Sequence, residues 1–284
     1  MSESASGAQR TPNPSQRTLR AVWLGRAAYE PVHALQHQLQ EARKARRIGD
    51  IVLFVEHEST ITLGRGATVD HLLTSEVALA EAGIAVVATG RGGDVTLHAP
   101  GQLVCYPILD LHPDRMDVRR YVKDLNRVMM ALAQSYGIHS GVIEKYIGLW
   151  ADLAAPSAWS GVEHARNPVK IGAIGVRISR WVTMHGFAFN LSTDLSLFRL
   201  IIPCGITEFG VASVASLTGS APSVESAAER ALPIVAEVFG YQLPELERIG
   251  LEDLAERVAT INTLPNGVPS DAPSTSHEKP APLS

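Results

Sequence analysis

The sequence predicts an α+β fold in which helices flank a mixed β-sheet. Two observations carry this prediction. Short apolar runs typical of buried strands are interspersed with longer segments whose apolar residues recur at helical spacing, and the two kinds follow one another irregularly rather than as a regular strand–helix–strand array. Apolar residues also make up 45% of the 284 residues, which is enough for a sizeable core.

The first half of the chain is expected to form four strands and two helices. Apolar residues at positions 32, 35, 39 and 42 share one face of the first helix, and Gly83 can end the second. Pro107 lies inside the last strand and predicts a bulge or an edge position there, because proline donates no backbone hydrogen bond. The expected strands cover residues 20–24, 50–55, 84–88 and 103–111, and the expected helices cover residues 29–47 and 75–83.

A long helix is expected in the middle of the chain. Asp117 is a favourable N-cap, the helical pattern continues through Tyr136, and Gly137 ends it. Its apolar residues recur at positions three and four apart, so that they form one buried stripe. The expected stripe consists of Val118, Tyr121, Val122, Leu125, Val128, Met129 and Leu132.

A hairpin and two helices are expected in the remainder. Residues 171–178 and 181–191 have the composition of two paired strands joined by a tight turn. Ser223 begins a helical region that Pro233 should kink or split, because proline removes one helical hydrogen bond and clashes with the preceding turn. A last short helix is expected over residues 251–258.

The two ends of the chain differ from its middle in composition. Residues 1–17 and 262–284 are rich in polar and small residues without an apolar period, so we expect them to be disordered tails around one catalytic domain at 18–261. The first tail lacks the apolar stretch of a signal peptide, and no apolar run approaches the roughly 20 residues of a membrane span. The expected location is therefore the cytoplasm, with no membrane partner.

Charge and cysteine content narrow the function further. A formal net charge of −4 creates no basic field for nucleic acid. The local basic run at residues 43–47 is interpreted as a solvated helix end, with a dock for an acidic partner as the alternative. Two cysteines, Cys105 and Cys204, do not make a disulfide framework and fit a reducing compartment.

The residues most suggestive of chemistry are Lys170 and Cys204. Lys170 leads into an apolar, glycine-bearing strand, whereas most lysines face solvent. Cys204 lies between Pro203 and Gly205, which leave the space beside its sulfur open. A cation beside a thiol favours the thiolate, the species that attacks acyl carbons. The simpler reading is a buried inert cysteine, and that reading is expected for Cys105 in the middle of a strand.

Glycines and histidines form the rest of the candidate site. The turn at residues 91–93 could cradle an anion, although neither a dinucleotide fingerprint nor a Walker A sequence is present. His98 and His185 could each orient a substrate carbonyl or move a proton, or could be structural histidines near a pocket. The sequence has no cluster of residues at zinc-ligand spacing. We therefore expect no metal and no bound cofactor.

Taken in order, these blocks resemble the lipoyl(octanoyl) transferase family, also called octanoyl-[acyl-carrier-protein]:protein N-octanoyltransferase. The resemblance covers about residues 50–220. It rests on Thr62-Leu63-Gly64-Arg65, Arg91-Gly92-Gly93-Asp94-Val95-Thr96-Leu97-His98, Lys170-Ile171-Gly172-Ala173-Ile174-Gly175, His185-Gly186-Phe187-Ala188-Phe189-Asn190 and Pro203-Cys204-Gly205-Ile206. It implies the fold shared with biotin and lipoate protein ligases.

The resemblance also implies an acyltransferase activity in lipoate biosynthesis. An octanoyl group would move from acyl carrier protein to a lysine of lipoyl domains, in subunits of 2-oxoacid dehydrogenases and in the glycine cleavage H protein. Cys204 would carry the acyl group as a thioester. Lys170 would promote the thiolate and act as acid and base. The implied substrate-binding residues are Arg91, Gly92, Gly93, Asp94, Val95, Thr96, Leu97, His98, Ala173, Ile174, Gly175, Gly186, Phe187 and Ala188, with His185 as an auxiliary residue.

Several details of the site follow from this chemistry. Backbone amides near Cys204 and Gly205, or in a turn at residues 173–175, could hold an oxyanion. Phe187, Leu97 and Ile174 are candidates to line an apolar slot for the acyl chain. Leu97 and Ala99 stand where the family usually has tyrosine and glycine, which would change the wall of the binding block. Residues 151–169 form a longer segment than expected and should make a surface loop.

Three other functions remain compatible with the residues. An ATP-dependent lipoate or biotin ligase would share the fold and would not need Cys204. A catalytically silent module that binds a carrier protein would need neither Cys204 nor Lys170. A cysteine hydrolase would use water in place of the acceptor amine. Intact mass after mixing with octanoyl-carrier protein separates these readings.

Overall fold

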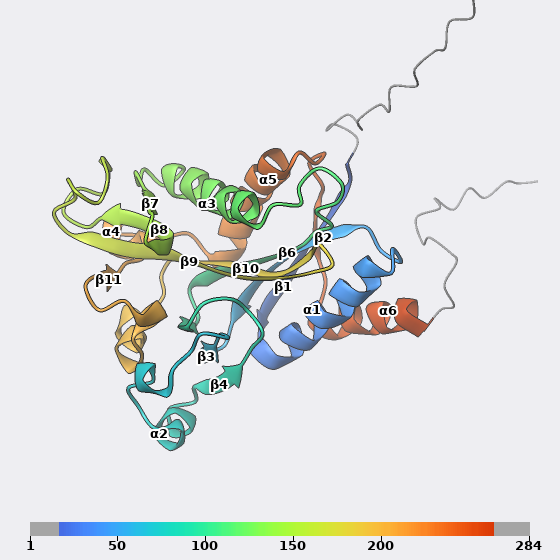
Figure 1. The fold of residues 1–284 in the computed structure, drawn as a ribbon, viewed down its shortest axis with the longest axis horizontal. Coiled ribbons are helices and arrows are strands. Elements are labelled where there is room, and N and C mark those ends of the chain that lie inside the picture. The colour runs from blue at the N-terminus through green and yellow to red at the C-terminus, as the bar shows by residue number, and fades with distance from the viewer. Residues whose placement is uncertain (1–16, 264–284) are drawn as a thin grey trace, which may run out of the picture.

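The computed structural model describes residues 17–263 and confirms the mixed sheet flanked by helices (Figure 1). Within these residues one large sheet has the strand order β12-β1-β2-β6-β10-β9-β8-β7, and β11 pairs with β9 at its side. Its strands are β1 (Leu19–Ala27), β2 (Asp50–His57), β6 (Gln102–Ile108), β7 (Gly141–Ile143), β8 (Tyr146–Asp152), β9 (Pro168–Ser179), β10 (Val182–Asn190), β11 (Gly210–Val211) and β12 (Leu246–Arg248).

A smaller sheet lies beside the large one and has the order β4-β3-β5. Its strands are β3 (Thr60–Leu63), β4 (Ala85–Ala88) and β5 (Val95–His98). Only β4 matches a strand predicted from the sequence. All three strands are four residues long, but β3 and β5 contain polar residues and so lack the continuous apolar run of β4. The predicted helix α2 (Glu76–Glu81) lies between β3 and β4, and the Ser75 side chain caps its N-terminus.

Helices cover both faces of the large sheet (Figure 1). On one face lie α3 (Val118–Gln134) and α5 (Val224–Phe239), which pack on the largest apolar cluster. On the other face lie α1 (Tyr29–Lys44) and α6 (Leu251–Thr263), which pack on a second cluster. The short elements are α4 (Val214–Thr218), η2 (Val69–His71), η3 (Leu195–Leu200) and η4 (Pro203–Gly205).

The predicted central strand is confirmed, but Pro107 marks neither an edge nor a bulge on β2. Strand β6 lies between β2 and β10, and Pro107 pairs in register with Val52 of β2. Toward β10 the ladder stops at the Cys105–Phe187 pair. The Thr183 hydroxyl donates to the Pro107 carbonyl at 2.7 Å. A side chain thus satisfies the Pro107 acceptor where the ladder to β10 has stopped.

Three predictions about the helices need correction. The N-cap of α3 is confirmed because the Asp117 carboxylate accepts from the Arg120 N–H, but Val118 is 47% exposed and leaves the buried stripe. Pro233 does not split α5, which continues through it to Phe239. Helix α6 continues to Thr263, well past residue 258.

The predicted tails fall almost entirely outside the described residues. Residues 1–16 and 264–284 lie outside that part of the chain. Among the described ends, the Arg17 carbonyl accepts from the Gln242 N–H at 3.0 Å. The Asn262 side chain donates to the Gln38 carbonyl at 3.3 Å, so both ends of the described chain contact the folded core.

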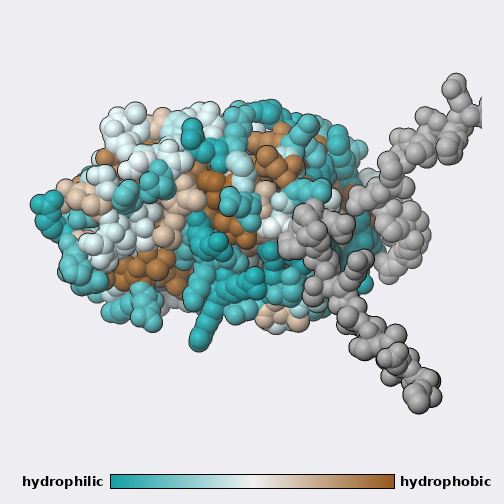
Figure 2. All heavy atoms as spheres, turned by 90° about the horizontal axis from the view of Figure 1, so that it is seen from above, coloured by the Kyte–Doolittle hydropathy of each residue, from teal (hydrophilic) through white to brown (hydrophobic). Residues whose placement is uncertain are grey.

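The surface above α3 and α5 is divided rather than uniformly apolar. Figure 2 shows separate hydrophobic patches on this face with hydrophilic side chains between them. Exposed apolar side chains on and beside α3 include Met116, Val118 and Met130. The predicted surface loop follows β8, and residues 153–167 connect it to β9. The Asp152 carboxylate holds this loop by accepting from the N–H groups of Ala154, Arg166 and Asn167.

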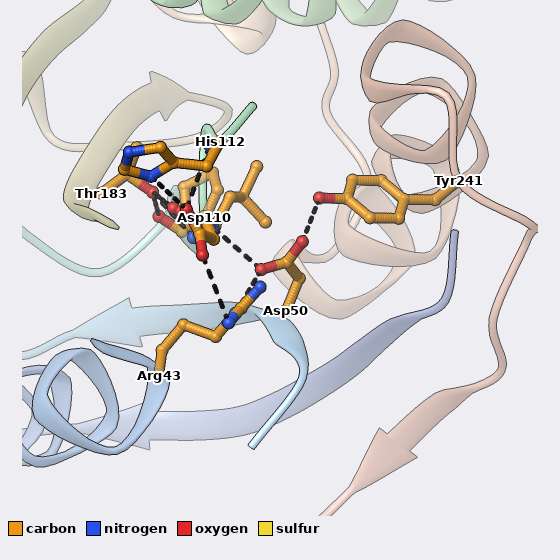
Figure 3. A network of polar contacts seen from close by, with 8 residues as sticks. Arg43, Asp50, Asp110, His112, Thr183 and Tyr241 are labelled. Atoms are coloured by element: carbon orange, nitrogen blue, oxygen red, sulfur yellow. Dashed lines mark hydrogen bonds and ion pairs between the residues drawn. The ribbon is translucent and has the colours of Figure 1, made fainter. Parts of the chain in front are cut away.

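The basic run at residues 43–47 is not simply a solvated helix end. The Arg43 guanidinium donates to Asp50 at 2.7 Å and lies 3.5 Å from Asp110 (Figure 3). The Tyr241 hydroxyl donates to the same Asp50 at 2.6 Å. Arg47 donates to the Asn262 carbonyl at 2.7 Å. These arginines therefore tie α1 to the sheet and to α6, a role that their spacing in the sequence does not reveal.

Candidate active site

Lys170 and Cys204 are 34 positions apart in the sequence and meet in the structure. The Lys170 Nζ lies 3.5 Å from the Cys204 Sγ. Lys170 belongs to β9 and is only 6% exposed. Cys204 belongs to η4, where it adopts a left-handed conformation with φ of 56°. Such backbone strain in a non-glycine residue is common at functional sites, where surrounding contacts hold it.

Strand β8 shapes the place where the lysine side chain lies. Trp150 pairs with Lys170, and the Lys170 Nζ lies 5.6 Å from the centre of the Trp150 ring. Gly148 has φ of 135°, and a Cβ there would come within 2.5 Å of the Lys170 Cε. A side chain at position 148 would therefore displace the lysine. Within residues 17–263 no carboxylate pairs with Lys170, so the thiol and an aromatic ring are its partners.

A cavity of about 460 Å³ opens beside Cys204. It brings together residues from β5, β6, β9, β10 and the loop before β5. Eleven of the sequence-predicted residues line it: Arg91, Gly93, Thr96, His98, Ala173, Ile174, Gly175, His185, Gly186, Phe187 and Ala188. Tyr29 and Tyr106 also line it, and the sequence analysis missed both because they lie in the α1 and β6 patterns as ordinary apolar positions.

Some predicted residues do not line this cavity. Val95 and Leu97 are fully buried in a separate apolar cluster with Ile61 and Leu79, because they point to the other face of β5. Leu97 is thus not part of the acyl slot. Ala99 packs in the same cluster, so neither departure from the family pattern changes the cavity wall as predicted.

Gly92 and Asp94 line an outer groove of about 1160 Å³ instead of the cavity. Cys204 lines both spaces and therefore lies where they meet. Exposed side chains on the far wall of the groove include Val118 and Ile147. The sulfur can be reached from outside through the groove and can deliver a group into the cavity.

The Arg91 side chain has a supporting role, because its hydrogen bonds within the protein leave few N–H groups for binding an anion. Its guanidinium is 6% exposed and donates to the Thr62 carbonyl at 2.6 Å and to the Thr62 hydroxyl at 2.9 Å. Burial lowers the pKa of this guanidinium. The Gly92 N–H donates to the Val176 carbonyl at 2.9 Å, and a Cβ on Gly175 would come within 2.9 Å of Arg91. Gly175 therefore lets the 91–93 turn lie against β9.

His98 is part of a hydrogen-bond chain that joins two of the motifs, residues 91–98 and 185–190. Its Nδ1 donates to the Gln102 amide oxygen at 2.8 Å, and the Gln102 amide donates to Asn190 at 2.9 Å. Asn190 in turn donates to the Ala212 carbonyl at 2.9 Å. Burial lowers the pKa of His98 to about 3, so the imidazole stays neutral at pH 7. His98 is a structural histidine on the cavity wall and is poorly suited to proton transfer.

His185 differs from His98 because neither of its ring nitrogens has a partner among residues 17–263. Burial, together with the neighbouring His33 and Arg91, lowers the pKa of His185 to about 2. Its backbone φ is 60°, opposite Pro107 where the β6–β10 ladder is interrupted. A neutral, unpaired imidazole on the wall can form a hydrogen bond with a bound molecule but is a weak base.

A second buried pair lies at the tyrosine side of the cavity. The Tyr106 hydroxyl donates to the His57 Nε2 at 2.9 Å, and the His57 Nδ1 donates to the Ala27 carbonyl at 3.0 Å. Burial lowers the pKa of His57 to about 4. Burial likewise raises the pKa of Tyr29 to about 12. Both tyrosines and the neighbouring histidines are therefore neutral at pH 7.

The remaining predictions concern cysteine reactivity and metals. Cys105 is fully buried, and burial raises the pKa of its thiol, as expected for an inert core cysteine. In the described part of the chain no group of three or more histidine, cysteine or carboxylate side chains is placed to hold a metal ion. No helix within residues 17–263 is long and apolar enough to cross a membrane.

Comparisons with known proteins place this chain among its relatives. Residues 28–235 match the family described as the lipoyl protein ligase A/B catalytic domain. The chain is 42% identical over 236 residues to the octanoyltransferase of Chloroflexus aurantiacus, covering 83% of this chain and 100% of that protein. It is 46% identical over 204 residues to the octanoyltransferase of Myxococcus xanthus, which covers 72% of this chain but only 55% of that protein.

Solved structures with low sequence identity share the fold. A lipoate-protein ligase A bound with ATP superposes with a TM-score of 0.62 at 15% identity, over 87% of this chain and 95% of that one. A bipartite lipoate protein ligase from Thermoplasma acidophilum also has a TM-score of 0.62 at 15% identity, over 87% of this chain and 93% of that one. The ligase-like fold expected from the sequence is therefore confirmed for lipoate ligases.

Proposed function

We propose the function of this chain from its family: it belongs to the lipoyl protein ligase A/B catalytic family and, within it, to the octanoyltransferases. On this premise it transfers octanoyl groups to lipoyl domains through an acyl-Cys204 thioester. The contact of 3.5 Å between the Lys170 Nζ and the Cys204 Sγ carries this proposal. It supplies a cation beside a thiol where an inner cavity and an outer groove adjoin.

Lys170 is placed to activate the sulfur. An ammonium without a carboxylate partner stabilises a neighbouring thiolate more than one that is already neutralised. Burial strengthens this attraction because the local dielectric is lower than in water. Cys204 would attack the donor thioester, and Lys170 would give its proton to the departing thiol.

Two backbone amides are available to stabilise the tetrahedral intermediate. Among residues 17–263 the Cys204 N–H has no acceptor, whereas the Gly205 N–H is occupied by the Ile202 carbonyl. Residues 173–175 lie in β9 and not in a turn. The N–H and C=O of a strand residue point to the same side, and Val176 accepts from Gly92 across the open edge of β9. By alternation the Ile174 N–H faces that edge too, beyond the end of β8.

The cavity wall combines apolar side chains, which suit an acyl chain, with uncharged polar side chains. Phe187 and Ile174 offer apolar wall, and Ala173, Gly175 and Gly186 leave room along the strands. The histidines of the wall are uncharged at pH 7, so an octanoyl chain would not have to displace the hydration of a buried charge.

The donor would be octanoyl-acyl carrier protein, and the acceptors would be lipoyl domains of 2-oxoacid dehydrogenase subunits and of the glycine cleavage H protein. The groove outside Cys204 is open to such protein-borne groups. A thioester is already activated, so the reaction would need no nucleotide, and a cytoplasmic location would supply both partners.

An intact-mass experiment tests this proposal. The full chain is mixed with octanoyl-carrier protein in chelator and without ATP, and an octanoyl adduct is expected on Cys204. Addition of apo lipoyl domain should then move the adduct to the acceptor. Modification that appears only with free octanoate or lipoate plus ATP would establish the ligase alternative. Release of free octanoate in place of transfer would establish a hydrolase.

A further inference from the structure

A histidine–carboxylate pair that the sequence analysis did not single out lies beside the Cys204 loop. His71 is the last residue of η2, and its Nδ1–H donates to an Asp94 carboxylate oxygen. The His71 side chain is 27% exposed and Asp94 is 14% exposed. Within residues 17–263 the His71 Nε2 has no partner. A histidine oriented through Nδ1 by a carboxylate, with Nε2 free, is arranged to accept a proton.

The pair is in direct contact with the loop that carries the sulfur. A Cβ placed on Gly205 would lie 3.0 Å from the His71 Cε1 and 3.2 Å from the Asp94 Oδ2. The Ile202 N–H donates to the His71 carbonyl at 2.9 Å, which ties η2 to the approach to Cys204. Asp94 is held in turn, because its Oδ1 accepts from the Val95 N–H at 2.7 Å.

The proton balance of the proposed reaction requires a second base. The acceptor lysine begins as an ammonium and ends as an amide, so it loses two protons. In the first half-reaction Lys170 protonates the departing thiol and becomes a neutral amine. It can then take one proton from the acceptor nitrogen, which restores the Lys170 ammonium beside the Cys204 thiolate. The other proton must go elsewhere.

We propose that His71, oriented by Asp94, accepts this second proton and so converts the incoming ammonium into the attacking amine. This inference rests on the proposed transferase function. The His71 Nε2 takes one proton from the ammonium, and the amine nitrogen then forms a C–N bond with the acyl carbon. The C–S bond to Cys204 breaks, the second proton moves to Lys170, and the His71 imidazolium releases its proton to solvent.

The burial of the two candidate bases supports this division of work. Lys170 is 6% exposed and lies between the sulfur and the Trp150 ring, on the inner side of the site. His71 is about a quarter exposed and is accessible to a lysine on another protein. The titratable group that contacts this imidazole is Asp94, and Gly205, the residue after Cys204, lies against both. Arg91 interacts electrostatically with Asp94 and with Cys204, and Asp70 precedes His71 in the chain.

The test separates the two half-reactions. Cys204 is first acylated with octanoyl-carrier protein, the donor is removed, and apo lipoyl domain is added while intact mass follows the loss of the acyl-enzyme. In His71→Gln we expect acylation near the wild-type rate and transfer slower by roughly 10²-fold, the usual contribution of a general base. Asp94→Asn should slow transfer less. The transfer rate of His71→Gln should rise with pH and approach the wild-type rate at alkaline pH, because only the acceptor amine that has already lost its proton can then attack.

Two controls distinguish a base from a structural support. Hydroxylamine is a neutral nucleophile at pH 7, so it should discharge acyl-Cys204 equally fast in His71→Gln and in the wild type. His112→Gln removes a similar histidine that pairs with Asp110 far from the sulfur, and it should leave both half-reactions unchanged. Equal transfer rates in His71→Gln and wild type would overturn the inference. Slow discharge by hydroxylamine as well would assign His71 to loop support and would also overturn it.

Failure of the underlying function has a different signature. If the wild-type chain takes no octanoyl group onto Cys204 from the carrier protein, the transferase proposal fails before His71 is tested. If Cys204 is acylated normally and only the His71 comparison shows no difference, the transferase proposal stands and this inference alone is wrong.

Discussion

Buried cations at the two ends of the large sheet have different partners. At one end Arg43 is 17% exposed and pairs with Asp50 and Asp110, and Tyr241 completes the hydrogen bonding of Asp50 (Figure 3). At the other end Lys170 is 6% exposed and has a thiol and an aromatic ring as partners. The first arrangement satisfies every charge and holds elements together. The second leaves a charge available, which reactivity requires.

Each end also contains a histidine–aspartate pair. His112 pairs with Asp110 at the network end and is about half exposed, with nothing reactive beside it. His71 pairs with Asp94 against the loop of Cys204. The same two residue types are therefore a surface contact in one place and a candidate base in the other. The position of the pair relative to the sulfur decides between these two roles, and the identity of the residues does not.

The largest expected effect is the loss of the sulfur. Cys204→Ser should reduce octanoyl transfer by at least roughly 10³-fold, because it removes the nucleophile. Cys105→Ser should stay active, since that thiol is buried with a raised pKa. Peptide mapping of the adduct checks both variants, and an octanoyl group on Cys105 would contradict the assignment.

Lys170→Met should separate activity from stability. Alkylation of Cys204 near pH 7 and octanoyl transfer should both fall, the latter by roughly 10²–10³-fold. The free energy of unfolding should stay the same or rise by about 1 kcal/mol, because an unpaired buried cation is replaced by an apolar side chain of similar size. Urea unfolding and iodoacetamide kinetics on the same preparation measure the two effects. A large loss of stability would show that Lys170 is structural.

The same substitution at the network end should have the reverse outcome. Arg43→Met leaves Asp50 and Asp110 without their cation, and we expect it to lower the free energy of unfolding by about 3 kcal/mol. Activity per folded molecule should remain that of the wild type at a temperature where the variant is folded. A variant as stable as the wild type would show that solvent screens this pair.

The smallest expected effect concerns acid. The pKa of His57 is lowered to about 4 in the folded state, whereas an unfolded histidine titrates near 6.5. The unfolded chain therefore binds the extra proton first, so the stability from this residue is complete above pH 6.5 and is lost as the pH falls toward 4. Each such histidine contributes up to about 1.4 kcal/mol per pH unit in that window.

His57→Gln should remove one such contribution from the pH dependence. Urea unfolding between pH 4.5 and 7.5 should show a slope that is shallower by about 1.4 kcal/mol per pH unit than in the wild type. Identical slopes in the variant and the wild type would mean that His57 is hydrated in the folded state.

Much of the fold was predictable because its signals are local. The N-cap of α3 at Asp117 and the hairpin of β9 and β10 follow from side chains within a few residues of one another. The errors occur where distant contacts override local preference. Pro107 occupies a central strand, where the Thr183 hydroxyl satisfies its carbonyl, and α5 continues through Pro233.

The sequence by itself determined the chemistry-bearing motifs, since Lys170, Cys204 and most of the cavity wall lie in short blocks with recognisable residue types. Only the tertiary structure decided which of those side chains face the cavity. It also placed Leu97 in the core and left the ring nitrogens of His185 without partners among residues 17–263. It alone placed His71 against Asp94, 23 positions away, beside Gly205. The physical reason is that reactivity depends on burial and on distances of a few ångströms between residues remote in the chain, and local patterns carry neither quantity.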